Sequence, residues 1–567
     1  MTTTRGMVIV SVLYWLLGMH FFMHNPGGAG LYLPFNAWGW IFASLVIALC
    51  LWQVTLRQRL VISSLQLGLW LGALLLLLPM AYPGFELKDY AIPRLLGLFA
   101  GLLFLFGLYQ WRLGRPARDR LLYLLLGAVA IEALLGLVQY YLLTPGNWIG
   151  YDIRANRPYG IFQQPNVMAS FMATGLALAI WLDLRREGNP WLQGLRYGVI
   201  MSTSLLLVVL QSRVGQLGGA LALILLVPQL YRQRQLGRML GLVVLGVAFG
   251  LVSQYGMSGV KRGLEIYQSG GMRSIYWPYA AKLIAEAPWT GWGYGSFESV
   301  FLQHYMADKA QHPAMVQIEY NLDHPHSEFL YWAVEGGIAP MFGMVLMGGA
   351  LLWRVSRAGW VRGPALLALV TPILLHTQTE YPFYHAIAHW WALLLLVHVL
   401  DAEVEEGGEA SWREYTYRPW LLLRFAAIAI PLIVVPFMLT AIHTAWVVTQ
   451  YERGGYKQPA LLLDIVNPMA WLTRVEFDVN AVRLAVGLRA NNPTELEAYL
   501  DWGETFVRHT PRANIYANMV LALKALGRTA EAESLRSRAL QLYPGEPLLT
   551  GSAARSVATT LERKPSS

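Results

Sequence analysis

Long apolar segments recur along the first 446 residues of this chain. Each runs for roughly 17 to 25 residues, which is enough for a helix to cross a hydrocarbon core about 30 Å thick. Hydrophobic residues make up 56% of the sequence and charged residues only 14%, a balance that an ordinary soluble fold does not have. The sequence therefore predicts an α-helical polytopic membrane protein with about 13 transmembrane helices.

The expected spans share an apolar core and are joined by polar or arginine-containing loops. They are residues 7–24, 37–56, 61–80, 92–111, 121–143, 166–184, 197–211, 214–231, 237–255, 328–353, 363–377, 385–400 and 420–446. The first span lacks a small-residue cleavage site and more spans follow it, so we expect it to be retained rather than removed as a signal peptide.

Arginine is concentrated in alternate loops between these spans. The arginine-rich loops are those at 57–59, 112–120, 185–196, 232–238 and 354–362. Because positively charged loops stay in the cytoplasm, the amino terminus is expected inside and a large loop, about 256–327, is expected in the periplasm of a bacterial inner membrane. This topology accounts for the net charge of +9, since the arginines form no stripe with interleaved aromatic residues that would bind nucleic acid.

Two domains are expected. Residues 1–446 form a transmembrane domain that includes the periplasmic loop, and residues 447–567 form a helical periplasmic tail. Residues 515–544 have helical periodicity around Gly527 and weakly resemble one tetratricopeptide repeat. A lone repeat cannot bury its own apolar face, so we expect it to pack on other helices of the tail as a scaffold or an acceptor-docking element.

Five clusters of polar residues lie in segments that should face the periplasm. They are residues 157–166, 212–215, 273–277, 324–328 and 376–384. Polar groups at membrane depth are costly and mark functional sites, so we expect these clusters to share one face although they are far apart in sequence. The single cysteine, Cys50, lies in an apolar span and excludes an internal disulfide or a cysteine-based metal cluster.

Two arginines of these clusters, Arg213 and Arg273, have the planar donor geometry that suits a phosphate or diphosphate. Each could instead snorkel or bridge a carboxylate. His324 and His326 begin a later cluster, and an imidazole there could accept a proton from an acceptor hydroxyl near neutral pH. Their spacing leaves a structural role or a metal pair open, although no third and fourth ligands have a recognised spacing.

One acidic residue, Glu132, lies near the middle of a span and must find a partner or be protonated. A hydrogen bond in helix packing and a functional role both remain open. The sequence has no glycine-rich phosphate loop, no nucleophile elbow and no zinc-protease motif, which makes soluble nucleotide-dependent chemistry a poor explanation.

These segments together resemble the Wzy, WaaL and PglL superfamily of membrane glycosyltransferases, which comprises O-antigen polymerases, O-antigen ligases and protein O-oligosaccharyltransferases. His326-Ser327, followed after nine residues by Gly337, is similar to the ligase signature, but Pro340 stands where the signature has Gly, Thr or Tyr. Residues 212–215 resemble the first essential-arginine site of the family, and residues 271–277 resemble the second. Residues 160–166 and 380–383, with the helical tail, favour the PglL branch over lipopolysaccharide ligases.

The resemblance implies a metal-independent reaction without a cofactor. A glycan on undecaprenyl diphosphate would be transferred to a Ser or Thr hydroxyl of a periplasmic or secreted protein such as a pilin. Arg213 and Arg273 would hold the diphosphate, and His326 would take the proton of the hydroxyl. The residues expected to bind substrate are Gln164, Asn166, His324, Glu380 and Tyr381.

Two other functions compete with this interpretation. An O-antigen ligase or polymerase would use the same chemistry with a glycan acceptor. A transporter or flippase would instead place its polar residues near the midplane, often in two paired halves. The sequence shows no internal repetition of the spans, and Glu132 is the main polar residue at mid-depth, so transport is disfavoured.

Overall fold

The chain folds into two compact units, each assembled from separate stretches of sequence. The computed structural model describes residues 3–185, 188–256, 271–418 and 420–550, so residues 257–270 of the expected loop, 551–567 of the expected tail and Arg186 lie outside the described residues. The membrane unit comprises residues 1–74, 95–270 and 342–471, and the loop-tail unit comprises residues 75–94, 271–341 and 472–567.

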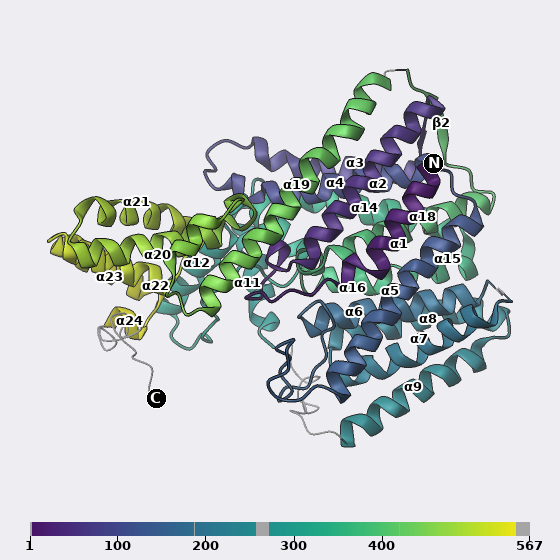
Figure 1. The fold of residues 1–567 in the computed structure, drawn as a ribbon, viewed down its shortest axis with the longest axis horizontal. Coiled ribbons are helices and arrows are strands. Elements are labelled where there is room, and N and C mark those ends of the chain that lie inside the picture. Colours follow the sequence, from purple (N-terminus) through teal and green to yellow (C-terminus); the bar gives the residue numbers. More distant parts are fainter. Residues whose placement is uncertain (1–2, 186–187, 257–270, 419, 551–567) are drawn as a thin grey trace. The chain divides into compact units, whose positions relative to one another are not determined.

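Eleven helices among the described residues are long and apolar enough to cross a membrane, as is one bent pair (Figure 1). They are α2 (Phe35–Arg57), α3 (Ser64–Leu77) with the 3₁₀ turn that extends it to Ala81, α4 (Ile92–Gln110), α5 (Arg115–Tyr141), α6 (Pro165–Asp183), α7 (Pro190–Val209), α8 (Arg213–Arg232), α9 (Leu236–Gly256), α14 (Ile338–Ser356), α18 (Ile387–Glu406) and α19 (Trp420–Arg453). The bent pair is α15 (Gly359–Leu367) with α16 (Thr371–Thr377), which meet at 56°. The chain is therefore an α-helical polytopic membrane protein, as its sequence predicts.

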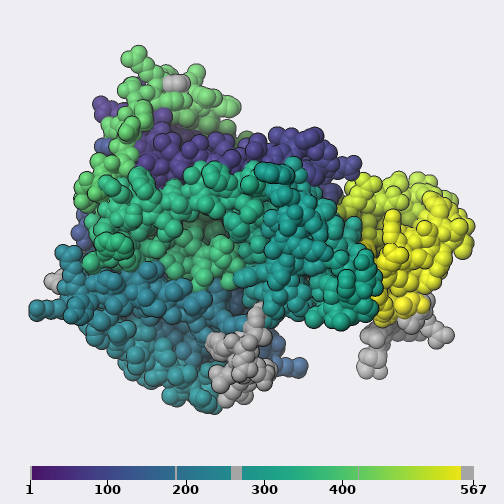
Figure 2. All heavy atoms as spheres, turned by 180° about the vertical axis from the view of Figure 1, so that it is seen from behind, coloured from purple at the N-terminus to yellow at the C-terminus, as the bar shows by residue number. Residues whose placement is uncertain are grey.

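The loop-tail unit is a helical body with a core of its own. It contains α11 (Arg273–Glu286), α12 (Phe297–Gln311), α13 (Glu328–Gly336), α20 (Leu472–Ala490), α21 (Pro493–His509), α22 (Ala513–Ala525), α23 (Thr529–Leu542) and α24 (Pro547–Thr550). One apolar core takes side chains from α11 and α12 as well as from α20 to α23, so the loop helices and the tail helices stabilise each other. Figure 2 shows the tail helices, coloured toward yellow, as one continuous group of side chains.

The helical hairpin expected around Gly527 is confirmed. Helices α22 and α23 pack on each other, and Gly527, with a φ of +76°, lies in the turn between them. Glycine suits this turn because other residues rarely adopt a left-handed backbone. The hairpin packs against α12 and α21, as a lone repeat must. The likeness to a tetratricopeptide repeat and the domain boundary at residue 446 stay predictions.

The first helix, α1 (Thr3–Leu16), has only 14 residues and does not count as a span by its length. Its first residue nevertheless bonds Gln53 near the carboxyl end of α2, whereas the chain enters α2 at the opposite end of that helix. The chain must therefore travel the length of α2 between Thr3 and Phe35. The described residues thus hold eleven candidate spans, or twelve if the bent pair is one span, against the thirteen expected, and α1 is the expected span that falls short.

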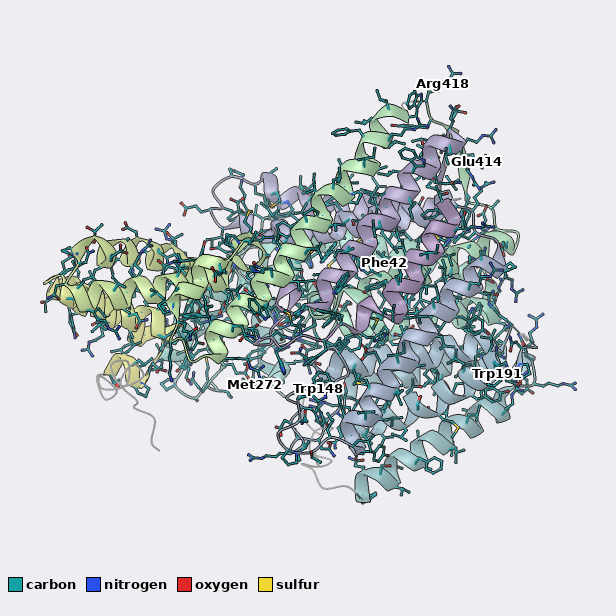
Figure 3. All side chains as sticks on the ribbon, viewed as in Figure 1. Phe42, Trp148, Trp191, Met272, Glu414 and Arg418 are labelled. Atoms are coloured by element: carbon teal, nitrogen blue, oxygen red, sulfur yellow. The ribbon has the colours of Figure 1, made fainter. Side chains whose placement is uncertain are left out.

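One end of the membrane unit, here called the ion-pair end, gathers the arginine-rich loops. Glu403 of α18 accepts hydrogen bonds from Arg118 (3.3 Å), Arg185 (2.5 Å) and Arg362 (2.5 Å), which lie on three other segments. A short antiparallel pair of strands, β1 (Arg59–Ile62) and β2 (Arg413–Thr416), lies at this end too. Figure 3 shows Trp191 and Glu414 of the ion-pair end on the opposite side of the bundle from Trp148. The alternation of arginine-rich loops is therefore confirmed.

The other end, here called the site end, holds the starts of α2, α6 and α18. The side chain of Asn36 on α2 donates to the His385 carbonyl (2.9 Å) and accepts from the Ile387 backbone (2.9 Å) at the start of α18. His389, one turn into α18, contacts the Val167 carbonyl in the first turn of α6 at 3.0 Å. These contacts fix three helix starts beside one another.

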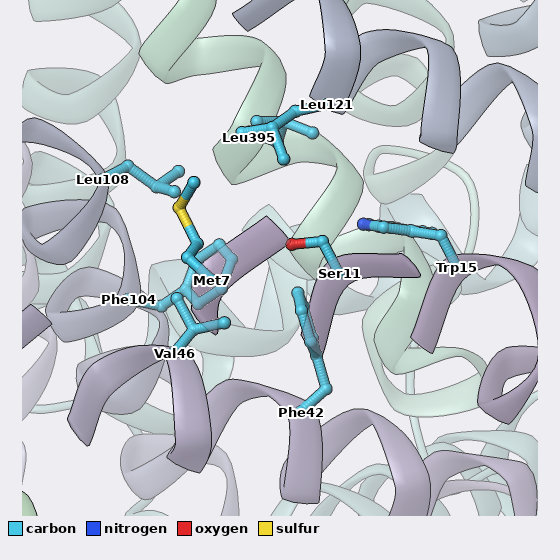
Figure 4. Close-up of a pocket in the computed structure, with 9 residues that line it drawn as sticks. All are labelled: Met7, Ser11, Trp15, Phe42, Val46, Phe104, Leu108, Leu121 and Leu395. Carbon is cyan, nitrogen blue, oxygen red and sulfur yellow. The ribbon is translucent and has the colours of Figure 1, made fainter. Parts of the chain in front are cut away.

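A small cavity lies inside the membrane unit among α1, α2, α4, α5 and α18 (Figure 4). Its volume is about 10 Å³ and its lining residues are Met7, Ser11, Trp15, Phe42, Val46, Phe104, Leu108, Leu121 and Leu395. That volume holds about one water molecule at most. The cavity is a packing gap and has no room for a substrate.

Removing the buried arginine of the ion-pair end should destabilise the protein strongly. Arg354 pairs with Asp401, whose fully buried carboxylate also accepts hydrogen bonds from Tyr109 (2.7 Å) and Trp412 (3.1 Å). Arg354→Met leaves this charge buried without its counter-ion, which typically costs about 3–5 kcal/mol. Arg357→Met is the control, because Arg357 is 52% exposed in its pair with Glu409 and such pairs contribute about 1 kcal/mol or less. Thermal unfolding in detergent measures both variants, and equal midpoints would contradict this account.

Candidate active site

Helices α6 and α8 begin in the same way at the site end. Gln163 and Gln211 have left-handed backbones, with φ values of 59° and 49°. The next residues, Gln164 and Ser212, cap their helices, because each side-chain oxygen accepts a hydrogen bond from a backbone N–H group of the first turn. Such caps satisfy donors that the helix itself leaves without acceptors. The left-handed residue sets the direction in which each helix leaves its loop.

The two helix starts are joined to each other. The Ser212 hydroxyl donates to the Asn166 side-chain oxygen (2.8 Å), so the cap of α8 also holds the second residue of α6. Gly215 lies against Ala169 of α6 with no room for a Cβ atom. Arg213, the first residue of α8, is half-buried beside this junction. Its guanidinium and the positive ends of two helices together favour an anion.

Glu132 has the partners that its depth in α5 requires. Its carboxylate lies 2.6 Å from Nδ1 of His20 and accepts the Ile161 backbone N–H at 2.8 Å. Two helical turns later, the Gln139 side-chain oxygen accepts hydrogen bonds from the backbone N–H groups of Tyr159 (2.9 Å) and Gly160 (2.8 Å). These two side chains hold the loop that leads into α6. Glu132 thus serves helix and loop packing, and the partner that the sequence demands is present.

A buried polar group lies one turn below Asn166. The Ser170 hydroxyl is 2.7 Å from Nδ1 of His376 and 3.1 Å from Nε2 of His389. Nε2 of His389 also contacts the Val167 carbonyl, which can only accept, so this nitrogen carries the proton. The group ties α6, α16 and α18 together. Through His376, the group also holds the end of α16. Glu380 follows this end, and its backbone N–H donates to the His376 carbonyl (2.9 Å).

The structure places five of the predicted site residues at the site end of the membrane unit. They are Gln164, Asn166, Arg213, Glu380 and Tyr381. Glu380 is buried, and the Tyr381 ring stacks on the His385 ring with centroids 4.8 Å apart. For three of the five polar clusters, the expected shared face is therefore confirmed.

The other two clusters meet inside the loop-tail unit. Arg273 is the first residue of α11, and Tyr276, one turn later, stacks on the His326 ring at an interplanar angle of 10° and a centroid distance of 6.1 Å. Trp277 donates from its indole nitrogen to the Pro325 carbonyl (3.1 Å). The first turn of α11, which begins at Arg273, thus lies against the segment that carries His326.

His326 and His324 have different surroundings. His324 is buried, and its Nδ1 lies 2.9 Å from the Asp323 carboxylate, which fixes that nitrogen as the donor. His326 is half-buried, its ring centroid is 4.4 Å from that of His324, and its φ is +53°. A left-handed non-glycine residue stores strain and is typical of functional sites. His326 is therefore the histidine that a substrate can reach, and His324 is the one that the fold holds.

Helix α13 follows His326 and explains the glycine of the signature. Ser327 caps α13 by accepting from the Leu330 backbone (3.4 Å), as Ser212 caps α8. At the other end, Gly337 has a φ of +68°, and a Cβ atom there would lie 2.6 Å from the Trp289 carbonyl. Only glycine fits this position. Pro340 falls in the first turn of α14, where its missing N–H group is not needed.

Two ion pairs of the loop-tail unit were not singled out from the sequence. Arg94 pairs with Glu335 on α13, and its guanidinium lies 4.3 Å from the Trp332 ring centroid. Arg512 of the tail pairs with the buried Glu298 of α12. A charge at the edge of an apolar segment was the only signal for Arg94, and the partners are too far apart in sequence for spacing to reveal them.

Burial raises the pKa of two carboxyl groups in this unit to about 7, although nearby donors act against the shift. They are Glu298, beside Arg512, and Glu328, which accepts from the Trp332 indole (3.1 Å). The second oxygen of Glu328 is buried and has no hydrogen-bond partner among the described residues. A carboxyl that is easily protonated near neutral pH therefore lies two residues after His326.

Three family models match the chain. A Protein glycosylation ligase model matches residues 158–182, an O-Antigen ligase model matches residues 198–341, and a model described as Virulence factor membrane-bound polymerase, C-terminal, matches residues 364–558. The first range contains Gln164 and Asn166, the second contains Arg213, Arg273 and His326, and the third contains Glu380 and Tyr381. No curated protein matches the chain.

Adding a methyl group at Gly337 should damage the turn behind His326. Gly337→Ala combines left-handed strain of about 1–2 kcal/mol with a clash against the backbone of residues 289 and 291, which cannot move aside cheaply. Gly527→Ala in the tail is the matched control, since its φ is +76° and no atom lies within 4 Å of the added Cβ. We expect a clearly lower thermal midpoint for Gly337→Ala than for Gly527→Ala. Indistinguishable midpoints would show that the turn tolerates a side chain.

The Glu328 carboxyl should make the protein less stable at alkaline pH. Its folded pKa of about 7 lies above the ordinary glutamate pKa of 4.5, so between these two pH values the folded state keeps a proton that the unfolded chain releases. Stability from this group is present at about pH 4.5 and is lost as pH rises through 7, by up to about 3 kcal/mol. Glu328→Gln should therefore raise the thermal midpoint at pH 8 and change it little at pH 5. The exposed Glu504→Gln is the control, and a Glu328→Gln effect that is independent of pH would refute the assignment.

Proposed function

Because this chain belongs to the superfamily of O-antigen ligases, O-antigen polymerases and protein glycosylation ligases, we propose that it transfers a glycan en bloc from undecaprenyl diphosphate to Ser or Thr hydroxyls of periplasmic or secreted proteins. The matched families indicate glycosyl transfer by a multi-pass membrane protein. The donor, the protein acceptor and the residue roles are the parts that we propose.

The arrangement around Tyr276 is the observation that carries the proposal. Arg273 begins α11 one turn before this residue, and the strained, half-buried His326 stacks on its ring. A cation that binds phosphate and an imidazole that accepts a proton are the two groups that displacement of a diphosphate by a hydroxyl requires.

In the proposed reaction, the acceptor oxygen attacks the anomeric carbon and forms the new glycosidic bond. The bond from that carbon to the diphosphate oxygen breaks, and the lipid diphosphate leaves with the electron pair. His326 takes the proton of the hydroxyl, while Arg213 and Arg273 stabilise the charge that grows on the diphosphate. A single displacement of this kind inverts the anomeric centre.

The reaction as proposed uses no cofactor and no metal ion. The donor is already activated by its leaving group, and two arginines supply the positive charge. The helix starts of α6 and α8 add backbone donors beside Arg213. Gln164, Asn166, Glu380 and Tyr381 are proposed to bind the glycan, and His324 is proposed to hold His326 in place.

We place the protein in the bacterial inner membrane with its amino terminus and ion-pair end in the cytoplasm. The positive-inside rule supports this orientation, since the arginines of five segments lie at that end. The site end then faces the periplasm, where lipid-linked glycans are available and nucleotides are not.

A glycan acceptor is the second candidate. The two longest family matches carry the descriptions O-Antigen ligase and membrane-bound polymerase, whereas the Protein glycosylation ligase match is confined to residues 158–182. This observation favours an O-antigen ligase or polymerase, in which the hydroxyl belongs to a saccharide. The residues proposed for donor binding and proton transfer are the same in both cases.

Three substitutions test the proposed roles. We expect His326→Ala to lower glycan transfer by about 10²–10⁴-fold through loss of the base. Arg213→Ala and Arg273→Ala should each lower it by about 10²–10³-fold through loss of charge stabilisation. The measurement is transfer from a lipid-diphosphate glycan by purified enzyme, with a chelator present so that a metal requirement would also be detected.

The control is His312→Ala, because His312 lies on the same loop and is exposed. Thermal midpoints of all variants must match that of the wild type for the comparison to count. Full transfer by folded His326→Ala would reject the base, and loss of wild-type transfer on chelation would reject the metal-independent scheme.

A further inference from the structure

The segment that follows α19 exposes apolar side chains to an unusual degree. Residues 459–471, here called the return segment, contain two short 3₁₀ helices, Pro459–Asp464 and Pro468–Trp471. Leu463 is 87% exposed, Val466 is 65% exposed and Met469 is 72% exposed. Asp464 is the only charged residue in the segment. Three largely exposed apolar side chains within seven residues need a partner other than water.

The return segment is firmly attached to α19 at a defined height. The buried Asn467 donates from its side-chain amide to the Phe437 carbonyl (3.1 Å) and to the Thr440 hydroxyl (3.1 Å), and its own carbonyl accepts from Thr444 (2.9 Å). Because α19 continues to Arg453, the chain passes the end of this helix and then comes back. At 1.5 Å per residue, Thr444 lies about 14 Å below that end.

A second attachment holds the end of the return segment beside the start of α2. The Trp471 indole donates to the Leu31 carbonyl (3.0 Å), and its ring meets the Tyr32 ring edge to face at a centroid distance of 4.8 Å. These residues directly precede α2, whose Asn36 bonds the start of α18 at the site end. The return segment therefore lies at the site end of the membrane unit.

The helix α19 is too long for all of it to lie within the hydrocarbon core. Its 34 residues span about 51 Å, which exceeds a hydrocarbon core of about 30 Å. The antiparallel α2, which packs along it, begins at Phe35. On α19, Leu432 and Ile433 are 67% and 68% exposed, so they belong to a lipid-facing surface that approaches Phe437 and the attachment point of Asn467.

We propose that the return segment inserts Leu463, Val466 and Met469 into the bilayer, at the boundary between headgroups and acyl chains of the leaflet on the site end. The lipid is the occupant that fits, since the exposed residues lie beside the lipid-facing surface of α19, and their attachment point at Phe437 is about 26 Å along that helix from Trp420, close to the thickness of a hydrocarbon core. A second copy of the chain is a poorer fit, because it would have to displace lipid from the surface of α19 beside the return segment.

This placement has a consequence for substrate access that rests on the proposed function. A lipid-diphosphate donor keeps its diphosphate at the headgroup level of one leaflet, and its tail lies among the acyl chains just below. The return segment would then occupy the same leaflet and the same depth as the donor. Its insertion itself stands on the contacts of Asn467 and Trp471 and requires no transfer activity.

Site-directed spin labelling tests the insertion directly. The only natural cysteine, Cys50, is completely buried, so a cysteine introduced at Leu463 or Met469 can be labelled selectively. The labelled full-length protein is placed in liposomes, and collision of the label with oxygen, which partitions into lipid, is compared with collision with a water-soluble nickel chelate. Ile433→Cys provides the lipid reference, and the exposed Lys457→Cys, beyond the end of α19, provides the aqueous reference.

We expect Leu463→Cys and Met469→Cys to give an oxygen-to-nickel ratio several-fold above that of Lys457→Cys and close to that of Ile433→Cys. Ratios equal to that of Lys457→Cys would overturn the proposal by placing the segment in water. Spin–spin broadening that grows with protein density in the liposome would overturn it in favour of a second copy. None of these results depends on glycan transfer, so failure of the proposed function would be seen separately.

Discussion

A charge buried in the membrane unit must be matched, because a bilayer offers no water to replace a missing partner. At the ion-pair end this constraint collects six arginines onto Asp119, Asp183, Asp401 and Glu403. At the site end it appears as capped helix starts. The same requirement therefore fixes the arrangement of the spans and leaves the site end free to carry chemistry.

Two of the three candidate catalytic residues, Arg213 and His326, belong to one local motif that the chain uses three times. Gln163, Gln211 and His326 each adopt a left-handed backbone, and the residue after each caps a helix. In α6 and α8 the motif brings two helix starts and Arg213 together, and their combined positive charge favours binding of an anion. In α13 the strained residue is itself the proposed base. The serine and glycine of the signature thus have structural roles, since Ser327 caps α13 and Gly337 forms the turn after it.

The sequence predicted the class of fold and the residues that gather at the site end, because hydrophobic periodicity and charge placement are local signals. It did not predict that Arg94 would pair with Glu335, that Arg512 would pair with Glu298, or that Ser170 would bridge two histidines. These contacts join residues far apart in sequence, and only tertiary packing brings them together. The short α1 was counted as a full span because its apolar run extends past the end of the helix at Leu16.

The central claim is that the glycan acceptor is a protein hydroxyl. The most direct test offers wild-type enzyme in liposomes both a periplasmic acceptor protein and a saccharide lipid, together with one lipid-diphosphate glycan, and then locates the glycan by mass spectrometry. The account predicts an intact glycan on a Ser or Thr residue of the protein. Glycan found only on the saccharide lipid would contradict it and would identify the enzyme as an O-antigen ligase or polymerase.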